Sequence, residues 1–170
     1  MRYQILQFSF LLVLLAVAML PPSLSASSGN FATDAFRKLQ SLEGNWQGST
    51  PQGEPVKSYI SPIASNTAVM ESLTVGRNQM VSLYSVDANS ILLVHYSASN
   101  NQPRMRAVPA SSSIQELVFS FEGGPSVGHE RKLIIEFQDS DHIIERWTSR
   151  RDGKDTDIVF HLERVRFSRN

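Results

Sequence analysis

The chain has 170 residues, of which 41% are hydrophobic, and its 16 Lys/Arg residues balance 16 Asp/Glu residues to a formal net charge of zero. It contains no cysteine, which excludes a disulfide scaffold, a thiol nucleophile and a cysteine zinc site. The basic residues are spread along the chain and form no basic face of the kind that nucleic-acid binding needs, so we expect no nucleic-acid partner.

The first 26 residues have the layout of a secretory signal peptide. Arg2 supplies a positive start, Phe10–Leu20 is an uninterrupted apolar run, and small residues follow a Pro-Pro pair. An uncleaved membrane anchor is the alternative, but the run is short for a bilayer, which needs about 20 apolar residues. We therefore expect a signal peptide over 1–26 and a single secreted or periplasmic domain over 27–170, with no membrane span after signal removal.

The segment 31–42 predicts a short helix. Thr33 can cap its N-terminus, Asp34 suits the first turn, and Phe36 and Leu39 form a narrow apolar stripe at helical spacing. The rest of the chain shows almost no helical period.

Short strand-like runs separated by turn residues fill the chain after this helix. The ranges are 45–49, 56–62, 67–75, 79–86, 90–98, 103–109, 115–122, 130–138, 142–150 and 155–167. Short connections favour antiparallel pairing in chain order, and closure removes the two exposed edges that an open sheet of this size would have. The prediction is an all-β protein: an antiparallel up-and-down barrel of about ten strands, with a short N-terminal helix at its closed end.

The opening motif Gly-Asn-Trp-Gln-Gly, at 44–48, resembles the calycin superfamily, which includes lipocalins and fatty-acid-binding proteins. In that group the glycine–tryptophan motif lies at the closed end of the barrel, and an arginine from the last strand packs across the indole. The resemblance implies that Gly44, Trp46 and Arg164 form a structural lock here. A guanidinium over an indole face contributes about 0.5–2 kcal/mol.

A second stretch is similar to secreted bacterial calycin-like domains of unassigned function. It contains the pair His95-Tyr96 and the core Asn-Gln-Pro-Arg-Met at 101–105. Relatives often have cysteine where this chain has Ser97, so no thiol role is implied at that position. This resemblance brings no activity with it.

Polar residues on apolar strand faces are the candidate ligand contacts. Glu71 shares a face with Val69 and Leu73, and Glu145 shares one with Ile143 and Trp147. If these faces point inward, each carboxyl must be paired or protonated. The alternative is that the apolar face lies outside, or that Glu71 lies in water at a strand end. The candidate cavity residues are Glu71, Tyr84, His95, Arg104, Arg106 and Trp147.

Arg104 and Arg106 share one face of their strand. They would suit a fork for a carboxylate or phosphate group, while a solvated outer face is the alternative for both.

The sequence contains no pattern typical of a metal site or a catalytic triad. The four histidines, at 95, 129, 142 and 161, show no zinc-site spacing, and no Gly-x-Ser-x-Gly elbow is present, so we expect no metal and no catalytic triad. Some bacterial calycins bind haem through a histidine on a late strand, which His161 would match. If Arg164 packs inward, however, His161 points outward, and we expect no cofactor.

Binding of a small apolar or amphipathic molecule inside the barrel is the function that these features favour over catalysis. An enzyme using Glu71, His95 and Tyr84 as acid and base is one alternative. A filled barrel that docks another protein on the outer face of Leu92, Val94 and Tyr96 is the other.

Overall fold

The computed structural model describes residues 30–124 and 128–166, so the expected signal peptide at 1–26 lies outside the described residues. Within these ranges the chain forms one helix and ten strands. They are α1 (Phe31–Gln40), β1 (Gly44–Ser49), β2 (Pro55–Ile63), β3 (Ala68–Val75), β4 (Asn78–Asp87), β5 (Ser90–Tyr96), β6 (Arg104–Ala107), β7 (Glu116–Gly123), β8 (His129–Phe137), β9 (His142–Arg151) and β10 (Lys154–Arg164).

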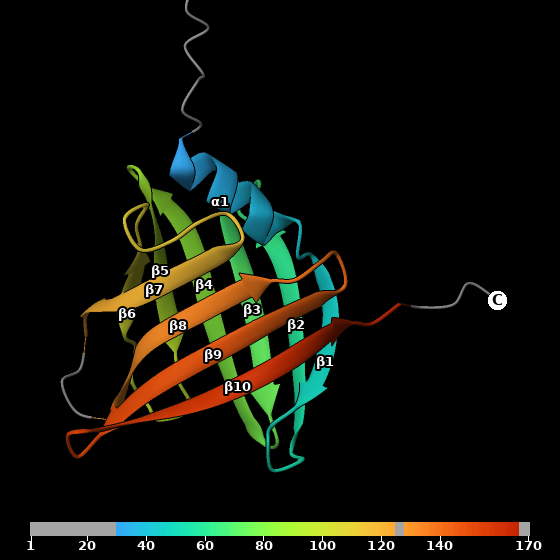
Figure 1. The fold of residues 1–170 in the computed structure, drawn as a ribbon, viewed down its shortest axis with the longest axis vertical. Coiled ribbons are helices and arrows are strands. Elements are labelled where there is room, and N and C mark those ends of the chain that lie inside the picture. The colour runs from blue at the N-terminus through green and yellow to red at the C-terminus, as the bar shows by residue number, and fades with distance from the viewer. Residues whose placement is uncertain (1–29, 125–127, 167–170) are drawn as a thin grey trace, which may run out of the picture.

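The ten strands form a closed barrel (Figure 1). Every strand pairs antiparallel with its neighbour in the chain, and β1 pairs with β10 to close the sheet. This confirms the predicted all-β, ten-strand meander, and each predicted range overlaps its strand. Inward side chains alternate with outward ones, so Leu133, Ile135 and Phe137 of β8 all contribute to the core. The architecture agrees with the one that the calycin resemblance implies.

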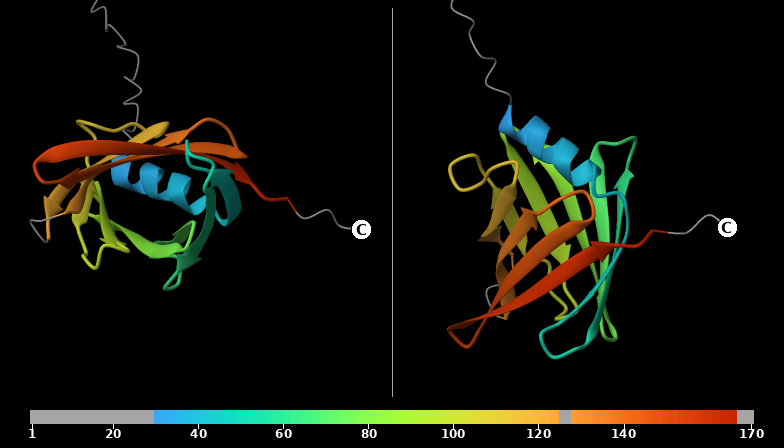
Figure 2. Two further views of the ribbon diagram at one scale, coloured as in Figure 1. Left: turned by 90° about the horizontal axis from the view of Figure 1, so that it is seen from below. Right: turned by 45° about the vertical axis from the view of Figure 1, so that its right-hand side comes forward.

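Helix α1 lies across one end of the barrel (Figure 2). It buries Ala32, Ala35, Phe36 and Leu39 against the barrel core. Its N-cap is Asn30, whose side chain accepts a hydrogen bond from the Ala32 backbone, 3.1 Å away. The predicted cap at Thr33 was wrong, because asparagine caps at least as well as threonine and an earlier start brings Ala32 onto the buried face.

The opposite end has no helix over it among the described residues. It is formed by the turns at 50–54, 76–77, 97–103 and 152–153, which join successive strand pairs. Among residues 30–124 and 128–166, no helix combines the length and apolarity needed to cross a bilayer. Within the part of the chain that the structure describes, the two ends of the barrel therefore differ: α1 covers one, and turns between strands border the other.

The two glycines that flank Trp46 make room for β10. A Cβ at Gly48 would lie 2.2 Å from the backbone oxygen of His161, and Gly44 has a φ of 137°, which L side chains rarely adopt. A Cβ at Gly44 would also lie 3.0 Å from a guanidinium nitrogen of Arg164. The Gly-x-Trp-x-Gly motif thus lets β10 approach β1 closely and leaves space for the arginine.

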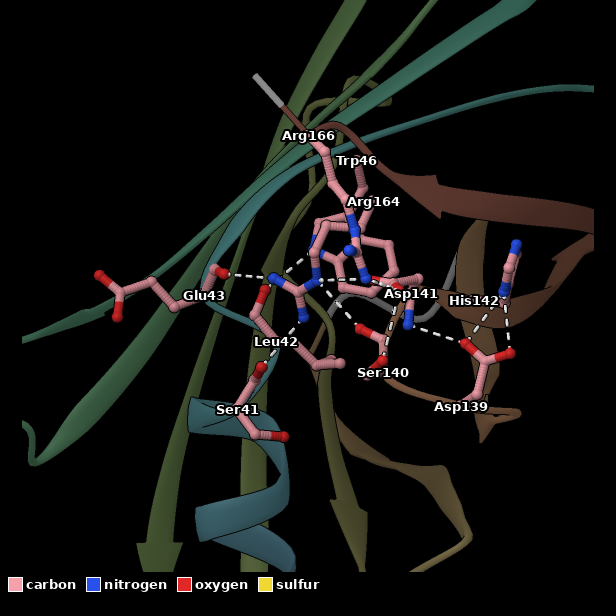
Figure 3. A network of polar contacts seen from close by, with 10 residues as sticks. All are labelled: Ser41, Leu42, Glu43, Trp46, Asp139, Ser140, Asp141, His142, Arg164 and Arg166. Atoms are coloured by element: carbon pink, nitrogen blue, oxygen red, sulfur yellow. Dashed lines mark hydrogen bonds and ion pairs between the residues drawn. The ribbon is translucent and has the colours of Figure 1, made fainter. Parts of the chain in front are cut away.

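Arg164 lies over the Trp46 ring, with 4.3 Å between its central carbon and the ring centroid (Figure 3). Its guanidinium donates to the backbone oxygens of Ser41, Glu43 and Ser140 at 2.5–3.1 Å. The Trp46 indole N–H in turn donates to the Leu42 backbone oxygen at 2.8 Å. One arginine thus ties the end of α1, the start of β1 and the β8–β9 turn to β10.

We expect Arg164→Ala to lower the free energy of unfolding by about 1–3 kcal/mol, because several backbone acceptors lose their donor and the indole loses its cation. Arg166→Ala is the matched control: it removes an exposed arginine that pairs with Asp141, and should change stability by less than about 0.5 kcal/mol. Urea denaturation of both variants measures the difference. Equal losses would contradict a special role for the Trp46 contact.

Candidate functional site

Two carboxyl groups meet in the middle of the barrel interior. Glu71 of β3 and Glu145 of β9 are each only 1% exposed. Glu71 accepts hydrogen bonds from the Ser58 hydroxyl at 2.7 Å and from the Tyr84 hydroxyl at 2.9 Å, one on each carboxyl oxygen. Glu71 is therefore held by neighbouring strands β2 and β4 as well as by the strand that carries it.

Burial and the nearby Glu71 carboxyl raise the pKa of Glu145 well above its ordinary value. Two adjacent carboxyls in a low-dielectric interior cannot both ionise, so Glu145 keeps its proton and hydrogen bonds with Glu71. Glu145 also accepts a hydrogen bond from the Trp147 indole N–H at 2.9 Å. Burial raises the pKa of the Tyr84 phenol as well, so it remains a donor. The Ser58 and Tyr84 hydroxyls thus donate to Glu71, while the Trp147 indole donates to Glu145.

The carboxyl pair and its hydrogen-bond donors form a polar layer across the barrel. His95 lies next to this layer, on the side of the end that α1 does not cover, which we call the uncapped end. Its Nδ1 is 3.0 Å from the Ser82 hydroxyl, and its ring stacks on Trp147 with 4.6 Å between centroids. Burial lowers the pKa of His95 to about 4, so the imidazole is neutral at physiological pH. His95 is therefore a polar but uncharged group.

A cavity of about 200 Å³ opens at the uncapped end of the barrel. His95 and Trp147 line it, and so does Leu73, which lies one inward position along β3 from Glu71. The carboxyl pair is thus one layer deeper than the cavity. The lining residues are Leu73, Val75, Asn78, Met80, His95, Ser97, Ala98, Ser99, Glu130, Trp147, Ser149, Ile158 and Phe160.

The six predicted cavity residues therefore separate into three groups. His95 and Trp147 line the cavity, while Glu71 and Tyr84 are buried in the layer beside it, where the Tyr84 hydroxyl bonds Glu71. Arg104 and Arg106 are the third group and lie on the outer face, which corrects their predicted place in the interior.

Strand parity explains the placement of the two arginines. Met105 and Ala107 of β6 are fully buried, so the alternating positions face outward. Arg106 forms ion pairs on that outer face with Asp87 at 2.7 Å and Glu122 at 2.8 Å.

Sequence reasoning did not find Ser58, Ser82 or Glu130, nor the meeting of Glu145 with Glu71. Ser58 and Ser82 occupy inward positions of their strands, which the alternation alone indicates. Contact between β3 and β9 across the barrel has no signal in a single sequence, because these strands are not neighbours in the sheet.

Other residues considered from the sequence lie outside the cavity. His161 is exposed on β10. Leu92 and Val94 are half-buried on the outer face of β5, and Tyr96 at its end is 46% exposed. Among the described residues no group of three or more His, Asp or Glu side chains is arranged to hold a metal ion.

No protein-family model and no curated protein sequence matches the chain. Among solved structures, the chain is similar to one described as "Structure of EF1p2_mFAP2b bound to DFHBI". The sequence identity is 12% and the TM-score is 0.40, and the similarity covers 77% of this chain and 99% of the other. A similarity of this degree assigns neither a ligand nor an activity to the chain.

We expect Glu71→Gln to destabilise the protein far more than Glu145→Gln. An amide at 145 still donates to the Glu71 carboxylate, whereas an amide at 71 faces the Ser58 and Tyr84 hydroxyls with one acceptor fewer. The first variant should lose about 2–4 kcal/mol and the second less than about 1 kcal/mol. Denaturant unfolding at pH 7 compares these isosteric variants, and the reverse order would mean that the shared proton resides on Glu71.

We expect stability to fall as the pH drops from about 6.5 to about 4. The folded state keeps His95 neutral down to about pH 4, whereas an unfolded histidine binds its proton near pH 6.5, so protons favour the unfolded state in this window. The loss from His95 should approach about 3 kcal/mol. His95→Gln should flatten the stability profile over this window, and His161→Gln, at an exposed site, should not. Thermal unfolding across pH 4–7 tests this, and an unchanged slope in His95→Gln would contradict it.

Proposed function

We propose that this protein is an exported binding protein of the calycin type, which takes a compact molecule with an apolar body into the cavity at the uncapped end. The observation that carries the proposal is the cavity itself, which apolar side chains such as Leu73, Met80 and Phe160 line together with hydroxyl, amide, imidazole and carboxylate groups. Concave, largely apolar sites with a few polar groups are the usual form of small-molecule sites. Export rests on the signal-peptide pattern at 1–26.

The size of the cavity limits the ligand. Its volume of about 200 Å³ is below the usual range for ligand pockets, about 300–1,000 Å³. At about 30 Å³ per water-sized group, it accommodates roughly seven non-hydrogen atoms. A long acyl chain does not fit, because the carboxyl layer and the side chains beyond it fill the barrel towards α1. We therefore place the ligand against His95 and Trp147, rather than with its polar end on Glu71 and Tyr84.

Binding is favoured over catalysis because the groups suited to acid–base chemistry do not converge on the cavity. Glu71 and Glu145 bond to each other and to buried donors in the layer below. His95, which does line the cavity, has a pKa of about 4, too low for an efficient general base near neutral pH.

Titration with benzyl alcohol, followed by calorimetry, tests the proposal. We expect saturable binding with a Kd between about 10 μM and 1 mM, in line with the ligand efficiency of very small ligands. Palmitate should not compete with benzyl alcohol, because its chain exceeds the cavity.

Two methionine variants localise this binding. Met80→Trp, on the cavity wall, should weaken it at least about tenfold, whereas Met70→Trp, on the outer face of β3, should leave it unchanged. No saturable binding of compact probes, or equal effects of the two variants, would reject the proposed site.

A further inference from the structure

Glu130 is the one side chain with a full charge among the described residues that line the cavity. The lining includes no lysine and no arginine, and its histidine, His95, is neutral. Nothing in the wall can therefore balance a negative group on a ligand. A ligand that carries a carboxylate or phosphate would meet no cation there.

A β-bulge directs Glu130 towards the cavity. Buried Leu133, Ile135 and Phe137 define the inward positions of β8, and strict alternation from them would turn Arg131 inward. The pairing of β8 with β9 shifts between Glu130 and Lys132, so Glu130 takes the position opposite Ser149. Bulges of this kind commonly redirect a side chain beside a functional site.

As a result, the Arg131 side chain lies outside the cavity. Its guanidinium carbon lies 5.9 Å from the centroid of the Phe121 ring, and the residue does not line the cavity. Because of the extra residue in the bulge, Glu130 rather than Arg131 faces the open end of the cavity, which we call its mouth.

The Glu130 carboxylate is only partly satisfied. Its Oε1 accepts a hydrogen bond from the Ser97 hydroxyl at 3.0 Å, but its Oε2 is buried and has no hydrogen-bond partner among the described residues. No lysine or arginine of the described chain forms an ion pair with it. A carboxylate that is partly desolvated and lacks a counter-ion attracts a cation that approaches it.

A buried carboxyl pair, Glu71 with Glu145, lies below the cavity floor, one inward position along β9 from Trp147. Between this pair and Glu130 the cavity presents the aromatic side chains of Trp147, His95 and Phe160. Aromatic faces attract cations, most strongly the indole of tryptophan.

We propose that the cavity selects small organic cations, in particular a protonated amine on a compact apolar body, and discriminates against carboxylates. The proposal rests on the proposed function, and names the chemical class of ligand for the same site. The amine lies at the mouth beside Glu130, and the apolar body contacts Leu73, Met80 and Trp147.

The test compares three probes with the same ring and different charge: benzylammonium, benzyl alcohol and benzoate. We expect calorimetry at pH 7 and low salt to give benzylammonium at least about tenfold higher affinity than benzyl alcohol, with benzoate the weakest. The advantage of the cation should shrink at higher ionic strength, because part of it is a charge–charge attraction near the surface.

Two charge-neutralising variants localise the effect. Glu130→Gln should remove most of the preference for benzylammonium while keeping the affinity for benzyl alcohol. Glu54→Gln makes the same change in net charge on an exposed turn at the same end of the barrel, and should leave the preference intact. An equal loss in both variants would assign the effect to overall charge and overturn the role of Glu130.

The outcomes separate this inference from the proposed function. Binding of benzyl alcohol with no preference for the cation, or with tighter binding of benzoate, overturns cation selection and leaves the binding site in place. If none of the three probes binds, both the site and its selectivity are rejected.

Discussion

The interior of this barrel is organised around one shared proton. Glu71 and Glu145 project from opposite parts of the sheet into a region that water does not reach, and each is 1% exposed. Two ionised carboxylates there would repel each other and would both lack solvation, so the closed barrel favours protonation of at least one of them, and the raised pKa of Glu145 makes it that one. The proton turns a repulsion into a hydrogen bond across the barrel, and Ser58, Tyr84 and Trp147 supply the remaining donors.

This polar layer divides the barrel into two parts of different character. On the side of α1, apolar side chains fill the interior, and the Trp46–Arg164 contact closes the end. On the other side, His95 and Trp147 form a floor beneath an open cavity. Since a satisfied polar network is rigid and costly to disrupt, the layer also limits how deep a ligand can enter. The shallowness of the cavity therefore follows from the same residues that stabilise the interior.

Much of the fold could be predicted from the sequence, because turn residues and period-two alternation recur along the whole chain after Gly44. The pattern also showed Glu71 and Glu145 on apolar faces, which made them interior candidates. It did not separate the two possible orientations of β6, where arginines alternate with Met105 and Ala107 over only four residues. The structure resolves this orientation by pairing Arg106 with Asp87 and Glu122 outside. Contacts across the barrel could not be predicted from the sequence, because they join strands that are distant in both sequence and sheet order.

Two local choices of register decide which charges the interior contains. A slip of one residue in β6 would turn Arg104 and Arg106 inward, since successive side chains of a strand point to opposite faces. In β8 the bulge makes a comparable choice: uninterrupted alternation would turn Arg131 inward, whereas the extra residue faces Glu130 to the cavity instead. Both choices keep arginine out of the cavity, so the charge that remains at its mouth is negative. The sign of the charge beside the cavity is therefore set by backbone register, and a sequence comparison that tracks only residue types would not reveal it.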